Sequence, residues 1–350
     1  MTTMLAAARR RPELVGLSFQ RTVDRNLLHR SALSEVFLTD CRPVGDDGYV
    51  AAAQLPPLHS YYTDHLHRTP LIDPMLLLEC CRQAETYGGH VVFGVPRDTA
   101  FILRDWSLRV TGPTALARAG GPVELAMVVH TTGRRAVGGS LRALVYEIDL
   151  VLGDRTVGHA HISVGYLPLA SYQQIRHGRR GSVPPSSATL APQPVGVPVP
   201  PHLVGRANPD NVLLQDVRLT SDGLTARIRP AVDHPSMFDH AQDHLPGMVM
   251  TESARQAGLL ALNDLYGLSP SRWVMTGMGA SFSAYAELDA PTLVRVRAAE
   301  RSGWPDTCEL VAEVEQDGTV IAEATLTMAQ PAASAGPIPT PAGAAVLAGR

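Results

Sequence analysis

Two stretches of the sequence share one pattern, and this pattern decides the fold. HPSMFDHAQDHLPGMVMTESARQA runs from His234 to Ala257, and HSYYTDHLHRTPLIDPMLLLECCRQA runs from His59 to Ala84. In each stretch a histidine is followed, after four residues, by Asp-His and later by Glu-x-x-Arg-Gln-Ala. A chain of 350 residues is long enough for two domains that each bury a core. The repetition therefore predicts two copies of one fold.

The segment that carries Glu-x-x-Arg-Gln-Ala is apolar nearly all round in both copies. PMLLLECCRQA and PGMVMTESARQAGLLAL lack the polar face of a surface helix, so each helix is expected to be enclosed by a sheet. Strand patterns joined by Gly-Asp turns surround both helices. The predicted fold class is α+β, in which each repeat is an antiparallel sheet wrapped around one buried helix.

Composition shifts divide the chain into five predicted segments. The stretch from Gly178 to Leu203 is dense in Pro, Ser and Gly, as a linker would be, and the C-terminus has the same character. The predicted segments are an N-terminal arm (1–22), repeat 1 (23–172), a Pro/Gly/Ser-rich linker (173–205), repeat 2 (206–330) and a flexible C-terminal tail (331–350).

The bulk composition excludes several classes of function. A net charge of −3 argues against a nucleic-acid binder, and no window approaches the ~18 apolar residues of a membrane span, so we expect a cytoplasmic protein. All thirty basic residues are arginines, which excludes a Schiff-base lysine and a P-loop lysine. We expect buried, reduced thiols at the four cysteines, which are Cys41, Cys80, Cys81 and Cys308.

A carboxylate and a guanidinium stand three residues apart in both helices. Glu79 and Arg82 share one helix face, as do Glu252 and Arg255. Such a pair on an exposed face is an ordinary ion pair worth about 0.2–0.5 kcal/mol. Because the pair recurs in two apolar helices, where a buried carboxylate needs a partner or a role, we predict a functional pair in at least one repeat.

Histidines in the loops before the two helices are the next candidates. His59, His65, His234 and His240 occupy matching places, where they either contact a ligand or brace the loop. His234, His240 and His244 are close enough in sequence to suggest zinc, but no HExxH pattern accompanies them. We therefore predict no metal.

The two helices are expected to begin differently. Gly247 follows Pro246 at the start of the second helix, where free amides of Gly247 and Met248 can polarise a carbonyl. Asp73 and Pro74 form a good structural start for the first helix and a poorer ligand site. The basic segment RHGRRG at 176–181 is expected to be solvated, with docking of an acidic carrier protein as the alternative.

The repeated motifs, together with VFLTD in the first strand region and DHLPGMVMTESARQA in the second half, resemble the A-factor biosynthesis (AfsA-like) hotdog family. The resemblance implies a tandem double hotdog whose repeats form an intramolecular pseudo-dimer, each site combining one repeat's helix with loops of the other. It also implies a synthase of actinomycete signalling molecules of the γ-butyrolactone, butenolide or furan type. The implied reaction moves a β-ketoacyl group from an acyl-carrier-protein or CoA thioester to dihydroxyacetone phosphate, without a cofactor.

Carried over by position, the resemblance implies functional roles for Glu79, Glu252 and Arg255. We expect Glu252, with its pKa raised by enclosure although Arg255 opposes this, to deprotonate the acceptor hydroxyl, and Arg255 to hold the phosphate. Substrate contacts are expected from Arg82, Gly247, Met248, His240, His65, His234 and His59.

One spacing departs from the wider hotdog pattern, in which related dehydratases place a histidine fourteen residues before the helix carboxylate. His65 has this spacing to Glu79, whereas Phe238 occupies the place before Glu252. This departure argues against dehydratase-like chemistry of a histidine and a carboxylate at the second site. Two alternative functions stay open for the whole chain: a hotdog thioesterase or dehydratase, and a non-catalytic module that binds acyl thioesters.

Overall fold

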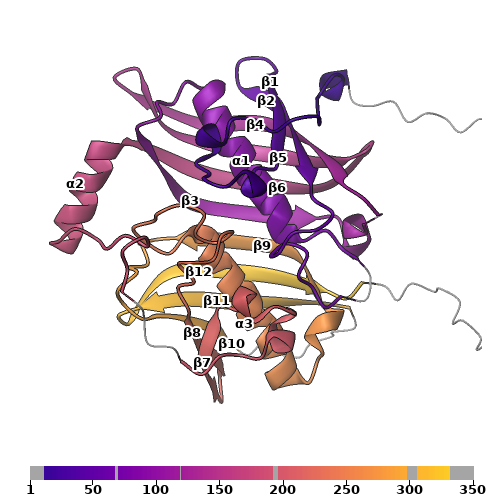
Figure 1. Cartoon of the computed structure of the whole chain (residues 1–350), viewed down its shortest axis with the longest axis vertical. Helices are drawn as coiled ribbons and strands as arrows, with labels where there is room; N and C mark the ends of the chain where they lie inside the picture. Colours follow the sequence, from indigo (N-terminus) through magenta and orange to yellow (C-terminus); the bar gives the residue numbers. More distant parts are fainter. Residues whose placement is uncertain (1–11, 68–69, 119, 192–195, 298–305, 332–350) are drawn as a thin grey trace, which may run out of the picture.

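The strands of the protein form a single antiparallel sheet (Figure 1). The structure is a computed structural model, and it describes residues 12–331 except 68–69, 119, 192–195 and 298–305. The sheet has twelve strands in the order β1-β2-β4-β5-β6-β3-β9-β12-β11-β10-β8-β7. Read from either edge to the middle, both halves follow the same order. This symmetry confirms the predicted repeat.

The elements of the first repeat are β1 (Leu38–Pro43), β2 (Gly48–Leu55), α1 (Pro74–Val91), β3 (Thr99–Val110), β4 (Val123–Val137), β5 (Ser140–Leu152) and β6 (Arg155–Pro168). Those of the second are β7 (Leu214–Thr220), β8 (Gly223–Ile228), α3 (Gly247–Tyr266), β9 (Val274–Phe282), β10 (Thr292–Arg297), β11 (Thr307–Gln316) and β12 (Thr319–Ala329). Every strand lies inside one of the two predicted repeats.

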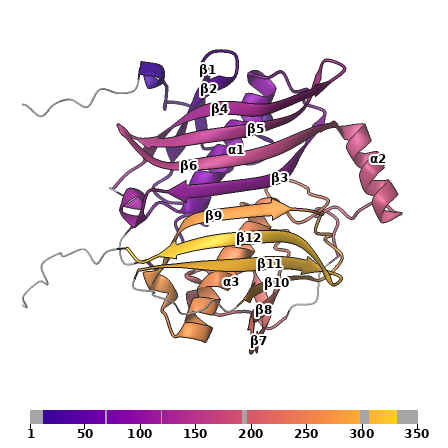
Figure 2. The ribbon, with the colours of Figure 1, turned by 180° about the vertical axis from the view of Figure 1, so that it is seen from behind.

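The two repeats join through their innermost strands. β3 pairs with β9 from Asp105↔Ser281 to Arg109↔Gly277, so the sheet continues across the junction. α1 and α3 lie against the same sheet, one in each half (Figures 1 and 2). Their apolar side chains share one continuous core with the strands. The tandem double hotdog is therefore confirmed.

The glutamine of Glu-x-x-Arg-Gln-Ala ties each helix to the strand region at the outer edge of its own repeat. Gln83 accepts hydrogen bonds from the amides of Phe37 and Leu38, and its amide nitrogen donates to the carbonyl of Glu35. Gln256 accepts from the amide of Leu213 and donates to the carbonyl of Asn211 in the same way. These bonds satisfy backbone groups at the start of a strand that a purely apolar helix face would leave unpaired.

A helix that was not predicted spans the end of the predicted repeat 1 and the start of the predicted linker. α2 (Leu169–Arg180) ends at Gly181, which adopts a left-handed conformation. The predicted solvated segment at 176–181 is also wrong for Arg176, whose side chain is only 4% exposed and pairs with Asp243 and Glu287. Arg180 pairs with Glu287 and Asp289. These contacts with the second repeat hold α2 in place, and they were invisible because the partners lie far along the chain.

The described part of the N-terminal arm packs on the outer face of the sheet. Leu14 is buried there against Val50, Val128 and Val151. The predicted tail at 332–350 and residues 1–11 of the arm lie outside the described residues. Cys80, Cys81 and Cys308 are buried as expected, Cys41 is partly exposed, and all four are free thiols. None of the helices in the described ranges is both long and apolar enough to cross a membrane.

Candidate active site

Glu252 is the centre of a buried ion cluster on α3. Its side chain is 1% exposed, and its carboxylate accepts hydrogen bonds from Arg206 (2.7 Å), from Nε of Arg255 (2.7 Å) and from Gln256 (2.7 Å). A second guanidinium nitrogen of Arg255 lies 2.6 Å away. With both oxygens occupied by cationic or amide donors, Glu252 holds the two arginines in place.

Arg206 is a member of this cluster that the sequence reading missed. It follows the short helix Pro201–Val204 and Gly205, whose left-handed conformation turns the chain toward α3. Its guanidinium donates to the carbonyls of Tyr61 (2.8 Å) and Asp64 (3.2 Å) and lies 4.5 Å from the centre of the Tyr61 ring. Arg206 therefore joins α3 to a loop of the first repeat.

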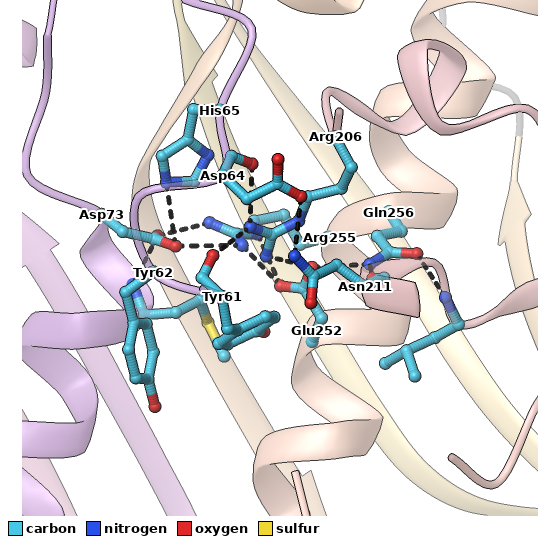
Figure 3. A network of polar contacts seen from close by, with 12 residues as sticks. Tyr61, Tyr62, Asp64, His65, Asp73, Arg206, Asn211, Glu252, Arg255 and Gln256 are labelled. Carbon is cyan, nitrogen blue, oxygen red and sulfur yellow. Dashed lines mark hydrogen bonds and ion pairs between the residues drawn. The ribbon is translucent and has the colours of Figure 1, made fainter. Parts of the chain in front are cut away.

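Arg255 also reaches across to the first repeat, through Asp73 (Figure 3). Its Nη1 lies 2.5 Å from Oδ1 of Asp73, and Nε2 of His65 lies 3.1 Å from the other oxygen of the same carboxylate. Asp73 also caps α1 by accepting from the amide of Met75. Asp73 therefore caps α1 as expected, and its carboxylate also connects His65 to Arg255, which the sequence did not indicate.

A small pocket that is partly open to solvent lies beside this cluster. Its polar lining comes from His65, His67, Asp73, Arg206 and Arg255. Its apolar lining comes from both repeats, through Leu71, Ile72, Val204, Leu259, Trp273, Val274, Met275 and Met328. Glu252 does not line the pocket, because the two guanidiniums stand in front of it. An apolar cavity with a few convergent polar groups is the usual form of a small-molecule site.

The electrostatics of the cluster correct the expectation for Glu252. Burial, the largest effect, raises the pKa of Glu252, but Arg206 and Arg255 together lower it by more, so the pKa lies below its ordinary value. The pKa of Asp73 is likewise raised by burial and lowered by more through Arg255 and His65, ending well below its ordinary range. Both carboxylates are therefore ionised at neutral pH. An enclosed glutamate gains a raised pKa only when no cation accompanies it.

A second cluster surrounds Glu79 on α1 and follows the same plan. Its carboxylate pairs with Arg30, accepts two hydrogen bonds of 2.8 Å from Arg82, and accepts one of 2.7 Å from Gln83. Arg30 follows a short helix and a left-handed residue, His29, just as Arg206 follows Gly205. Burial raises the pKa of Glu79, but Arg30 and Arg82 lower it by more, to about 2.

The loop that approaches the Glu79 cluster comes from the second repeat. Asp239 accepts from the amides of Ser31 (2.6 Å) and Ala32 (2.8 Å), next to Arg30. His240, beside it, feels the positive charge of Arg30 and Arg82. Each cluster thus combines one repeat's helix with the other repeat's loop, as predicted. The spacing of fourteen residues between His65 and Glu79 does not place them together, because His65 joins the Asp73 and Arg255 contacts instead.

Four other predicted ligand contacts lie elsewhere. His59 and His234 brace their loops: each ring accepts from two backbone amides two and three residues on, and faces Glu35 or Asn211 with its other nitrogen. Gly247 packs closely against Leu103, whose methyl group would lie 2.8 Å from an added Cβ. Neither Gly247 nor Met248 lines the pocket beside Arg255. Among the described residues, no group of three or more His, Cys, Asp or Glu side chains is arranged to hold a metal ion.

Comparison with known proteins gives one family. A model described as the A-factor biosynthesis hotdog domain matches residues 16–167 and 187–330. A 2-oxo-3-(phosphooxy)propyl 3-oxoalkanoate synthase of Streptomyces virginiae is 32% identical over 300 residues, covering 85% of this chain and 95% of that protein. A synthase of the same name from Streptomyces coelicolor is 28% identical over 272 residues, covering 77% and 80%.

Two solved structures that align with most of the chain have low sequence identity. A putative oleoyl thioesterase of Lactobacillus plantarum has a TM-score of 0.48 at 10% identity and covers 82% of this chain and 99% of its own. A bifunctional dehydratase-cyclase domain of ambruticin biosynthesis has a TM-score of 0.45 at 17% identity, covering 84% and 94%.

Proposed function

The chain belongs to the A-factor biosynthesis hotdog family, and on this premise we propose that it is a 2-oxo-3-(phosphooxy)propyl 3-oxoalkanoate synthase. The reaction transfers a 3-oxoacyl group from a thioester to the hydroxyl of dihydroxyacetone phosphate, releasing the thiol. The product is a precursor of a butenolide phosphate and of a γ-butyrolactone-type signalling molecule. Two relatives that match most of the chain carry the synthase name.

The pocket between the repeats is the observation that supports this proposal. It joins an apolar wall, suited to an acyl chain, to a polar wall with a histidine, a carboxylate and two guanidiniums. Acyl transfer to an alcohol needs a base for the hydroxyl and positive charge near the developing oxyanion. The polar wall supplies both.

His65 takes the role of base in place of Glu252. The ionised carboxylate of Asp73 lies 3.1 Å from Nε2 of His65, which leaves Nδ1 as the nitrogen that accepts the hydroxyl proton. After the alkoxide attacks the thioester carbonyl, the same ring returns the proton to the departing thiolate. Glu252 is a positioning residue, because its low pKa and its four donors leave it no capacity to take a proton.

Arg206 and Arg255 provide the positive end of the site. Their charges are fixed in place by Glu252 and Asp73, so they act on the oxyanion without first having to reorient. This replaces the expected role of Arg255 as the phosphate holder, because its donors are already engaged by two carboxylates. Leu259, Val274 and Met275 lie on the wall where the acyl chain would bind.

Mass spectrometry of the purified protein tests the function directly. The protein is incubated with a 3-oxoacyl thioester, as the carrier-protein or the CoA form, with and without dihydroxyacetone phosphate. We expect a phosphate-containing ester that appears only with the acceptor. Free acid in both samples indicates a thioesterase, enoyl thioester indicates a dehydratase, and unchanged thioester that remains bound indicates a non-catalytic module.

The variant His65→Asn separates the proposed base from the fold. Loss of general-base catalysis lowers kcat by about 10²–10⁴-fold. Asn is close in size to the histidine ring and keeps hydrogen-bonding groups near Asp73, so a normal melting temperature is the control. An unchanged kcat in a folded His65→Asn protein would contradict the assignment.

A further inference from the structure

The two ion clusters differ in their balance of charge. At the Glu252 cluster, Arg206 and Arg255 face two carboxylates, Glu252 and Asp73. At the Glu79 cluster, Arg30 and Arg82 form ion pairs with Glu79, and the charge of Asp239 acts on Arg30 from nearby without a direct ion pair. Six residues before each helix glutamate the chain has Asp73 in repeat 1 and Pro246 in repeat 2. Asp73 therefore brings a second ion-paired carboxylate to the Glu252 cluster from the start of α1, whereas the corresponding position at the start of α3 carries no carboxylate.

The arginines of the Glu79 cluster retain hydrogen-bond donors without acceptors. The Arg30 side chain is 7% exposed, and its Nε has no hydrogen-bond partner within the described residues. Nη1 of Arg82 has only a 3.5 Å contact with Thr86, whereas Arg255 uses all three guanidinium nitrogens on carboxylates. A buried donor without an acceptor is unfavourable, so a ligand that supplies the acceptor gains binding free energy there.

His240 lies close to the two guanidiniums of this cluster. Its Nδ1 is buried and makes no hydrogen bond in the described part of the chain, although the Asp239 carboxylate lies 3.6 Å away. Burial lowers the pKa of His240 first, and the charges of Arg30 and Arg82 lower it further. The ring is therefore neutral at pH 7; its Nε2 contacts the side-chain amide of Gln242 at 2.6 Å, and its Nδ1 is left without a hydrogen-bond partner among the described residues.

Solvent reaches this cluster. The Arg82 side chain is 22% exposed and the His240 side chain 36% exposed, while the Arg255 side chain is 7% exposed. A small anion can therefore approach Arg82 without unfolding the loop that carries Asp239. Guanidinium groups bind phosphate oxygens with paired, charge-assisted hydrogen bonds, so phosphate suits two arginines better than a halide does.

We propose that the Glu79 cluster is a second ligand site of the protein, which binds a phosphate monoester or inorganic phosphate between Arg30, Arg82 and His240. Glu79 holds the two guanidiniums in place through its ion pairs and takes no part in a reaction at this site. The site is separate from the pocket beside Arg255. The second site rests on the proposed function in one respect only. The proposed reaction uses dihydroxyacetone phosphate, whose phosphate is one source of the ligand, and inorganic phosphate is the other source.

Isothermal titration of the full chain at constant ionic strength tests this site with inorganic phosphate and, separately, with dihydroxyacetone phosphate. We expect Arg82→Gln to weaken the binding of inorganic phosphate at least tenfold. Arg179→Gln is the matched control, because it removes the same charge from an exposed position on α2. Equal binding by wild type and Arg82→Gln, or an equal loss in Arg179→Gln, would overturn the proposal.

A second variant adds a charge and keeps both arginines. Pro246→Asp places at the start of α3 the carboxylate that Asp73 provides at the start of α1, so it should neutralise Arg82 and weaken phosphate binding. A normal melting temperature confirms that the variant folds. Unchanged phosphate affinity in folded Pro246→Asp would count against the charge argument.

The titration and the product assay fail independently. If wild type makes the ester but binds no phosphate at the Glu79 cluster, the second site is refuted and the synthase assignment stands. If wild type binds phosphate, Arg82→Gln loses this binding and no ester forms, the second site stands and the synthase assignment is refuted. A larger loss of affinity for dihydroxyacetone phosphate than for inorganic phosphate in Arg82→Gln identifies the acceptor as the ligand, and equal losses identify free phosphate.

Discussion

Replacing Asp73 with asparagine tests the contact that links the two repeats at the pocket. Asn caps a helix about as well as Asp, so the hydrogen bond from the amide of Met75 is retained. The charge facing Arg255 and His65 is lost. The variant therefore isolates the ion pair from the cap.

The expected magnitude follows from burial. The Asp73 side chain is fully buried and that of Arg255 is 7% exposed. Removing one partner of a buried ion pair costs about 3–5 kcal/mol, and Arg255 keeps Glu252, so we expect about 3 kcal/mol for Asp73→Asn. Asp73→Ala also removes the cap, which adds about 1 kcal/mol.

Urea unfolding followed by tryptophan fluorescence and circular dichroism measures both variants. With an m-value of about 3 kcal/mol/M, a loss of about 3 kcal/mol lowers the midpoint by about 1 M. Asp289→Asn is the control, because it breaks an exposed ion pair worth about 0–1 kcal/mol. A midpoint of Asp73→Asn no lower than that of the control would show that Asp73 contributes no ion-pair stability and refute the reasoning.

The effect of pH has a definite sign. Because the pKa of Asp73 is lowered on folding, its ion pair stabilises the protein above the unfolded pKa of about 3.9, and this stability is lost as the pH falls through the folded pKa. We expect the gap between wild type and Asp73→Asn to stay constant from about pH 8 to about pH 5. The gap should narrow below about pH 4.

Three further predictions concern other parts of the fold. Burial raises the pKa of Glu85 to about 7, so the free energy of unfolding should fall as the pH rises from about 4 to about 7. Urea titrations across that range should show a smaller fall in Glu85→Gln, and an equal fall would count against the shifted pKa. Gly88→Ala places a Cβ 2.4 Å from the Tyr49 ring, which should cost about 1–3 kcal/mol in a urea titration; no loss would mean that the ring can move aside freely. Arg176→Ala removes the buried arginine that pairs with both Asp243 and Glu287 and should make α2 a site of rapid limited proteolysis, whereas Arg179→Ala should not; equal cleavage rates would refute the role of the buried arginine.

The sequence by itself determined the repeat and the fold. Two apolar helices that carry the same polar face, each between strand patterns, leave one arrangement in which both helices are enclosed and the strands are paired. The shared glutamates and arginines also identified the helix face on which both clusters form. These are local patterns, and local patterns are read directly from neighbouring residues.

Only the tertiary structure decided which residues meet in each cluster. Arg30, Arg206 and Asp73 lie far from their partners along the chain or in the other repeat, so spacing gives no sign of the contact. The pKa of a buried glutamate depends on how many cations surround it. Arg206, the second arginine of the Glu252 cluster, reversed the expected direction of the pKa shift of Glu252. Asp73 and Pro246 are both plain in the sequence, but their difference becomes a difference of charge only because each helix start is packed against the opposite repeat.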